Sequence, residues 1–159
     1  MKSKLLITLL LFLFKSSFSQ SFNELKTPLA NFVKRMYNDT KFEGVKVVDD
    51  YDHQYLVSVI SLDKAKYTNP SIMNRVAQVK AQSQANTFLN GATISMDMVI
   101  KTTEKNTKDS NNTLIETIES IKQNSMGFTQ GLELLTNFEN TDNNRMVFIY
   151  FREIKKEIK

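Results

Sequence analysis

The chain contains no cysteine, no tryptophan and only one histidine, His53, among its 159 residues. Without cysteine the protein cannot form a disulfide framework, a zinc finger, an iron–sulfur cluster or a thiol nucleophile, and it cannot carry a lipid on an N-terminal cysteine. A single imidazole excludes a metal site built from several histidines of one chain. The 4 glycines are too few for a glycine-rich phosphate loop. No pattern in the sequence predicts a bound cofactor.

The N-terminus has the three-part layout of a secretory signal peptide. Two lysines lie near its start, residues 5–14 are almost entirely apolar, and the small residues Ser17 and Ser19 stand at the −3 and −1 positions of a cleavage site before Gln20. An apolar run of about ten residues is too short to cross a bilayer as a helix, which takes about 20. The alternative, a buried N-terminal helix, would need cover on every side.

This layout predicts that residues 1–19 are removed and that residues 20–159 form a single domain, exported to the periplasm or outside the cell, with no transmembrane anchor. The removed segment holds three of the 21 basic residues and no acidic one, which leaves 18 basic and 17 acidic residues and a net charge of +1. Nucleic-acid binding needs a clustered basic face, so no nucleic-acid partner is predicted.

A helix and a hairpin are predicted first in the mature chain. The helix begins at Thr27-Pro28, a cap followed by proline at the first helical position, and ends near Asn38. Residues 44–48 and 55–62 have the pattern of two strands joined by a polar tip over residues 49–53. The second strand is apolar on both faces, which favours an interior position in a sheet.

A second long helix is predicted from Asn69-Pro70 to about Leu89, with Asn90-Gly91 as a left-handed stop. Three alanines spaced four residues apart form a ridge of small side chains on its inner face, which lets the helix axis approach a sheet closely. The whole predicted inner face consists of Ile72, Met73, Val76, Ala77, Ala81, Ala85, Phe88 and Leu89.

The rest of the chain completes a sheet. Strands are predicted over residues 93–101, 132–138 and 146–151, with a turn over residues 140–144 and a strand start between Gly127 and Gly131. Residues 113–123 form either a short amphipathic helix, which their apolar spacing favours, or a strand. The expected fold class is α+β, a mostly antiparallel sheet of about five strands with two or three helices packed on it.

The strand over residues 146–151 is apolar on both faces and includes Phe148, Tyr150 and Phe151. Such a strand needs cover on both sides. Helices are expected on one face of the sheet. The other face is covered by the N-terminal helix, by a partner or by a second copy, and an uncovered patch would mark an interaction site.

The candidate metal ligands are Asp49, Asp50, Asp52 and His53 at the hairpin tip. Carboxylate oxygens at alternating positions can bind Ca²⁺, and a histidine can join a transition-metal site. The turn glycine and the late bidentate glutamate of the known Ca²⁺ loops are not correctly spaced here. The alternative is that these aspartates cap backbone N–H groups of the turn.

Candidate catalytic residues are few. The sequence has no G-x-S-x-G nucleophile elbow. Paired carboxylates serve glycoside hydrolysis, and Glu116, Glu119 and Glu133 are candidates for such a pair. No catalytic residue is assigned, and an enzyme is not the favoured interpretation.

The segment from Arg75 to Phe151 resembles a small domain of the bacterial envelope, found in an outer-membrane lipoprotein family and at the N-terminus of flagellar T-ring assembly proteins. The resemblance covers about half of the chain and implies a mostly non-enzymatic domain of envelope assemblies. This chain lacks the lipid-bearing cysteine and has an added helix and hairpin, so neither anchor nor functional residue is carried over. The matching features are Arg75, Ala77, Lys80, Ala81 and Ala85, the strand after Gly91, Gly127-x-x-x-Gly131 and the strand Val147–Phe151.

Three functions remain open from the sequence. The first is an exported, soluble, non-enzymatic binding or assembly domain of the bacterial envelope, whose partner is an envelope protein, an envelope polymer or a second copy. The second is a small-ligand carrier with the ligand between the sheet and the N-terminal helix, where residues 23–38 act as a removable lid. The third is an envelope hydrolase that uses carboxylates.

Overall fold

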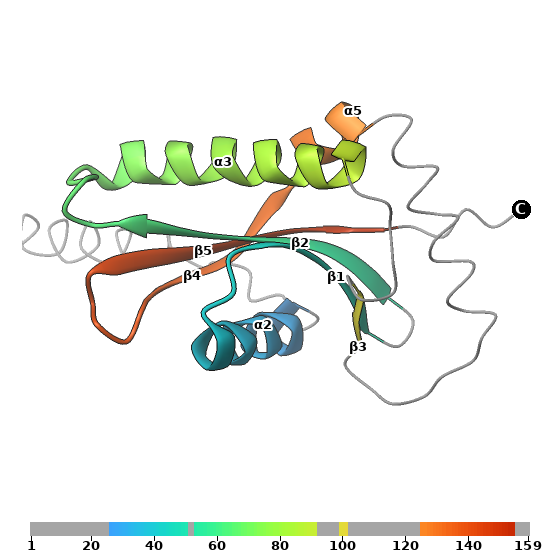
Figure 1. Cartoon of the computed structure of the whole chain (residues 1–159), viewed down its shortest axis with the longest axis horizontal. Coiled ribbons are helices and arrows are strands. Elements are labelled where there is room, and N and C mark those ends of the chain that lie inside the picture. Colours follow the sequence, from blue (N-terminus) through green and yellow to red (C-terminus); the bar gives the residue numbers. More distant parts are fainter. Residues whose placement is uncertain (1–25, 51–52, 92–98, 102–124, 155–159) are drawn as a thin grey trace, which may run out of the picture.

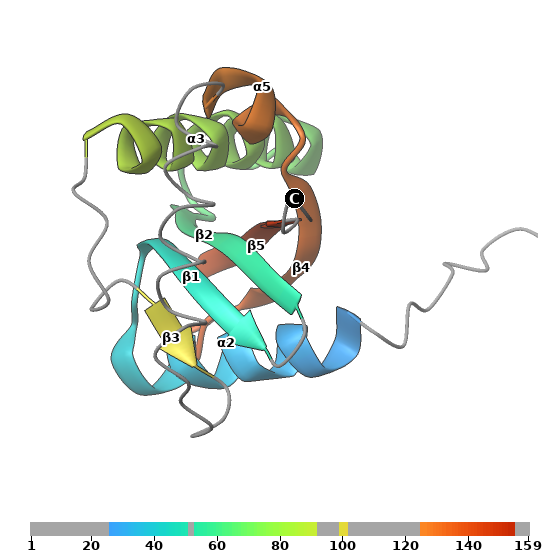
Figure 2. The same cartoon turned by 90° about the vertical axis from the view of Figure 1, so that its right-hand side faces the viewer.

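The structure, a computed structural model, describes residues 26–50, 53–91, 99–101 and 125–154. Its strands form one sheet in the order β3-β1-β2-β5-β4. Helices α3 and α5 lie on one face of the sheet and helix α2 on the other (Figures 1 and 2). The elements are α2 (Lys26–Thr40), β1 (Gly44–Asp50), β2 (His53–Asp63), α3 (Pro70–Gly91), β3 (Val99–Lys101), α5 (Ser125–Gln130), β4 (Glu133–Glu139) and β5 (Arg145–Glu153).

The predicted α+β class is confirmed. β1, β2, β5 and β4 are joined by antiparallel pairing, and the short β3 adds to the edge of β1 in parallel. The signal segment, Asp52, the helix over residues 113–123 and residues 93–98 of a predicted strand lie outside the described residues. No helix in the described part of the chain is long and apolar enough to cross a membrane.

β2 is an interior strand, as its sequence predicted. It lies between β1 and β5, and its side chains are buried from Leu56 to Leu62. Successive side chains of a strand point to opposite faces, so β2 contributes to two cores. Leu56 and Ile60 pack in the core under α3, and Val57 packs in the core over α2.

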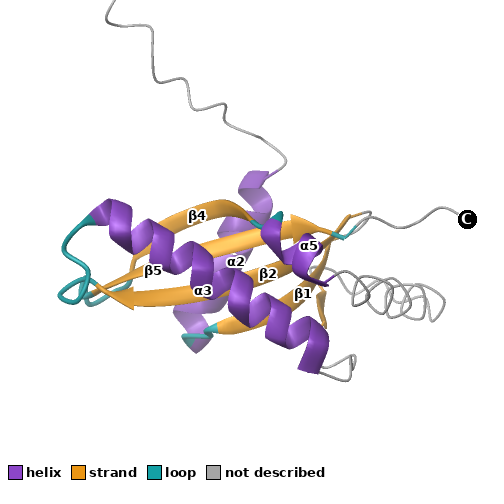
Figure 3. Ribbon diagram, turned by 90° about the horizontal axis from the view of Figure 1, so that it is seen from above, coloured by secondary structure: helices purple, strands orange, loops and turns teal. Residues whose placement is uncertain are grey.

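Helix α3 lies across the first face of the sheet (Figure 3). Its alanine ridge is confirmed, because Ala77, Ala81 and Ala85 are fully buried. The close approach lets the Ser58 hydroxyl donate to the carbonyl of Ala81 (3.3 Å). At the N-terminus, the Asn69 side chain accepts a hydrogen bond from the Ser71 amide (2.9 Å), which makes it the cap.

Two details of the α3 prediction are wrong. Ile72, expected on the inner face, is exposed. It neighbours the buried Met73 in sequence, and a rotation of about 100° per residue carries it off the sheet. Gly91 is the last helical residue and does not have the positive φ of a left-handed stop.

Helix α2 covers the second face of the sheet. It buries Leu29, Val33 and Tyr37 against a core that includes Ile149 and Phe151. Of the three candidates for covering this face, the N-terminal helix is the one in place. The aromatic residues of β5 are therefore divided between the two cores, with Phe148 and Tyr150 facing α3 and Phe151 facing α2.

The segment before β4 differs from the prediction of a strand start between Gly127 and Gly131. Ser125–Gln130 forms the short helix α5, and the strand begins at Glu133. Arg152 of β5 holds this helix, because its guanidinium donates to the carbonyls of Gly127 and Phe128 and lies over the Phe128 ring. A Cβ atom at Gly131 would overlap the same guanidinium, so a larger residue there would displace the end of the Arg152 side chain.

Candidate functional site

The predicted metal ligands that the structure describes are divided between the two faces of the sheet, and Asp50 and His53 stand directly opposite each other on paired strands. Neighbouring Val47 faces the α3 core and Val48 the α2 core, so strand alternation places Asp49 and Asp50 on opposite faces of the sheet. His53 Nδ1 lies 2.8 Å from a carboxylate oxygen of Glu153. Within the described ranges, no group of three His, Cys, Asp or Glu side chains can hold a metal ion, and Asp52 lies outside them.

His53 belongs to a row of rings on the α2 face. Its ring stacks on Tyr55 with the centroids 6.1 Å apart, and Tyr55 lies 5.9 Å from Phe151. Burial raises the pKa of the Tyr55 phenol above its ordinary value of 10.0, and the carboxylates of Glu153 and Asp50 raise it further. This end of the sheet therefore holds the phenol in its neutral form.

Glu153→Gln is expected to lower the pKa of Tyr55 towards 10.0, because it removes one of the charges that oppose the phenolate. The folded state binds this proton more tightly than the unfolded chain. The resulting stability is fully present below about pH 10 and is lost as the pH rises through the raised pKa. Ultraviolet titration of tyrosinate, compared with Tyr55→Phe and with the charge control Glu133→Gln, measures the shift. An unchanged titration curve for Glu153→Gln would contradict the inference that the Glu153 carboxylate raises the pKa of Tyr55.

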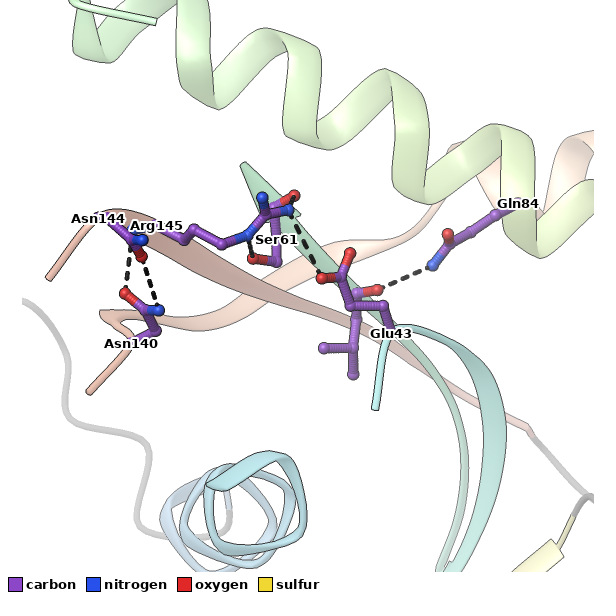
Figure 4. Close-up of polar contacts among 7 residues, drawn as sticks. Glu43, Ser61, Gln84, Asn140, Asn144 and Arg145 are labelled. Atoms are coloured by element: carbon purple, nitrogen blue, oxygen red, sulfur yellow. Dashed lines mark hydrogen bonds and ion pairs between the residues drawn. The ribbon is translucent and has the colours of Figure 1, made fainter. Parts of the chain in front are cut away.

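A polar network surrounds Arg145, at the point where β2 extends past the start of β1 (Figure 4). Pairing between β1 and β2 begins at Gly44 and Val59, so the carbonyls of β2 near this end need other donors. Arg145 Nη2 donates to the Ser61 carbonyl (2.9 Å), and Gln84 Nε2 donates to the Val59 carbonyl (3.1 Å). The two side chains thereby block an otherwise open strand edge.

Further contacts fix Arg145 in place. Its Nε donates to the Ser61 hydroxyl (2.6 Å), and its Nη2 lies 3.6 Å from a carboxylate oxygen of Glu43. The Asn140 side chain accepts a hydrogen bond from the Arg145 amide (3.0 Å) and donates to Asn144 (2.9 Å). The sequence predicted the turn over residues 140–144 but not the hydrogen bonds from Arg145 to Ser61.

Arg145→Met is expected to lower the free energy of unfolding by about 1–2 kcal/mol, because it removes two hydrogen bonds and leaves the Ser61 carbonyl without its donor. Lys64→Met is the matched control, since it removes only an exposed ion pair with Glu139 (2.8 Å), which stabilises by less than about 1 kcal/mol. Urea denaturation followed by circular dichroism compares the two variants. If both variants lost the same free energy of unfolding, the Arg145 network would stabilise the fold no more than a surface ion pair does.

Ser61 and Lys64 stand at the S-x-x-K spacing of serine acyltransferases. On a helix this spacing brings the lysine beside the serine, whereas in an extended strand residues an odd number apart point to opposite faces. Here the Ser61 hydroxyl accepts from Arg145 and Lys64 pairs with Glu139. Lys64 is therefore not placed to act as a base at Ser61.

Two hollows flank α3. The polar groove, about 400 Å³, lies beside the Arg145 network and is lined by Glu43, Ile60, Ser61, Lys80, Ser83, Gln84 and Thr87. The apolar cleft, about 320 Å³, lies between the N-terminal half of α3 and strands β4 and β5, with Met73, Met146 and Phe148 among its walls. Neither hollow was predicted, since each is formed by residues distant in the sequence.

Four large apolar side chains of the described residues stay exposed on the face of the sheet that α3 covers. Ile72 (54% exposed) and Val79 (64%) lie on α3, and Met126 (65%) lies on α5. Leu134 (45%) of β4 pairs with Tyr150, which faces the α3 core, so Leu134 also lies on this face. We call this face, with its helices and two hollows, the α3 side.

The carboxylates proposed for hydrolysis are not brought together in the described residues. Glu133 is exposed and pairs with Lys26 (2.9 Å), whereas Glu116 and Glu119 lie outside the described ranges. No family model, no curated protein and no solved structure matches the chain.

Proposed function

We propose that the chain is an exported, non-enzymatic binding domain of the bacterial envelope that contacts its partner through the α3 side. The observation that carries the proposal is the exposure of Ile72, Val79, Met126 and Leu134 on that side. Exposed apolar side chains next to hollows are typical of interaction surfaces.

The arrangement of the two cores supports this proposal. In the described residues the sheet is covered on one face by α2 and on the other by α3, so both faces have apolar cover within the chain. The apolar residues that stay exposed on α3 and α5 are consequently left over for a contact outside the domain. The signal-peptide layout and the resemblance to an envelope domain support the proposed location.

Photo-crosslinking in the native host tests the proposal. A photoreactive residue at Val79 or Leu134 is expected to form adducts with an envelope component, whereas the same residue at exposed Arg35 of α2 is not. The mass of the purified chain is expected to match a chain that begins at Gln20. Adducts of equal yield from all three positions, or an intact Met1, would overturn the proposal.

A second candidate function, a carrier of a small apolar ligand, is favoured by the apolar cleft of about 320 Å³. The position expected from the sequence, under α2, is filled by the buried Leu29 and Val33. Asn74→Trp would fill the cleft with an indole ring, and Ser83→Trp in the polar groove is the matched control. A carrier would lose a co-purifying small molecule, detected by native mass spectrometry, in the first variant only.

A further inference from the structure

Helix α3 carries a second apolar stripe that points away from the sheet. Ile72, Val76 and Val79 stand at positions i, i+4 and i+7, which share one face of a helix. Ile72 and Val79 are exposed, and Val76 lies half-buried at the edge of the α3 core. The stripe spans about 10 Å along the axis. We call these three residues the outer stripe.

Arg75 and Lys80 are the charged residues of α3, and both are basic. Neither α3 nor α5 contains an aspartate or glutamate. At about 100° per residue, Arg75 and Lys80 lie on opposite flanks of the stripe. Neither takes part in an ion pair within the described part of the chain. Glu43 lines the same groove as Lys80 but pairs with Arg145.

We infer that the outer stripe binds an amphipathic helix of a partner protein whose apolar residues are flanked by carboxylates. Apolar residues at i, i+4 and i+7 are the anchors used in helix-to-helix recognition. Acidic groups on the partner would complement the charges of Arg75 and Lys80. This inference rests on the proposed function and names the chemistry of its partner.

The same charges argue against two other occupants. A second copy of α3 would bring Arg75 and Lys80 against their own equivalents, and like charges across an interface are repulsive. A lipid surface is bound through clusters of about 4–8 basic residues, whereas the stripe has two. An acidic helix satisfies both cations and covers both exposed side chains.

Two synthetic helical peptides of about 14 residues test the inference with the purified chain. Both carry leucines at i, i+4 and i+7; one has glutamates on the flanks and the other has lysines. Fluorescence anisotropy is expected to show binding of the acidic peptide, and backbone amide NMR shifts are expected along residues 72–80. Arg75→Glu, Lys80→Glu and Val79→Asn should each weaken binding by at least about tenfold. Arg35→Glu on α2, the matched charge control, should not.

Several results would overturn the inference. These are equal binding of both peptides, no binding of the acidic one, shifts confined to the apolar cleft, self-association that Val79→Asn abolishes, and binding only to phosphatidylglycerol vesicles. The proposed function fails separately. If the acidic peptide does not bind but Leu134 still crosslinks to an envelope component, only the inference is lost. If the purified chain still begins at Met1, the proposed export is wrong, whatever the result of the peptide experiment.

Discussion

Val33→Asp is expected to unfold the domain at 25 °C or to leave it marginally stable. Val33 is 0% exposed at the centre of α2, and its side chain lies among the apolar residues of the second core. An aspartate there would place an unpaired carboxylate in an apolar layer, at a loss of more than about 4 kcal/mol. Small domains have a total stability of about 5–15 kcal/mol. Urea denaturation followed by circular dichroism measures the loss.

The matched control is Arg35→Asp, two residues further along the same helix. Arg35 is exposed, so its replacement should change the free energy of unfolding by less than about 0.5 kcal/mol. The two variants introduce the same side chain into the same helix and differ in burial. Similar urea midpoints for Val33→Asp and Arg35→Asp would show that α2 does not pack on the sheet as described.

This pair of variants also bears on the hypothesis that residues 23–38 form a removable lid. A lid closes over a ligand and can be deleted without unfolding the rest. Leu29, Val33 and Tyr37 instead bury the apolar face formed by β2 and β5. Deleting the segment would expose that face to water, so we expect an aggregated or unfolded product rather than an open carrier.

Local sequence signals predicted the elements well where they were strong. The Asn69-Pro70 start and the alanine spacing of α3, and the apolar pattern of β2, each correspond to an observed element. Local signals could not decide which face of the sheet α2 covers, because a helical apolar stripe fits either face. They also missed α5, a helix of 6 residues held by Arg152 from a distant strand.

The candidate surfaces were harder to predict than the fold. The Arg145 network joins residues 84 positions apart in the chain, and nothing local to Ser61 or Arg145 indicates the contact. The outer stripe is visible in the sequence, but the prediction places Ile72 on the inner face, whereas Val76, predicted there too, does pack against the α3 core. Adjacent positions of a helix are about 100° apart. Whether a side chain at the border of two stripes is buried or exposed therefore depends on how the helix is tilted on its sheet.

Ala81→Phe is expected to lower the free energy of unfolding by about 3 kcal/mol, the upper end of the usual range for overpacking. Ala81 is 0% exposed, and its carbonyl accepts a hydrogen bond from Ser58 on the sheet below. A phenyl ring has no space there, so α3 must move away from β2 or the ring must displace neighbouring core residues, and overpacking of this kind is destabilising. The shift would also break the hydrogen bond from Gln84 to the Val59 carbonyl.

Gln78→Phe is the matched control, since Gln78 is an exposed residue of the same helix. It introduces the same ring without entering the core and should change stability by less than about 0.5 kcal/mol. Chemical denaturation compares the two, and amide hydrogen exchange of α3 reports whether the helix itself has loosened. If Ala81→Phe matched Gln78→Phe in both measurements, the alanine ridge would not be what sets the distance between α3 and the sheet. The polar groove and the apolar cleft on its two sides would then owe their shape to other contacts.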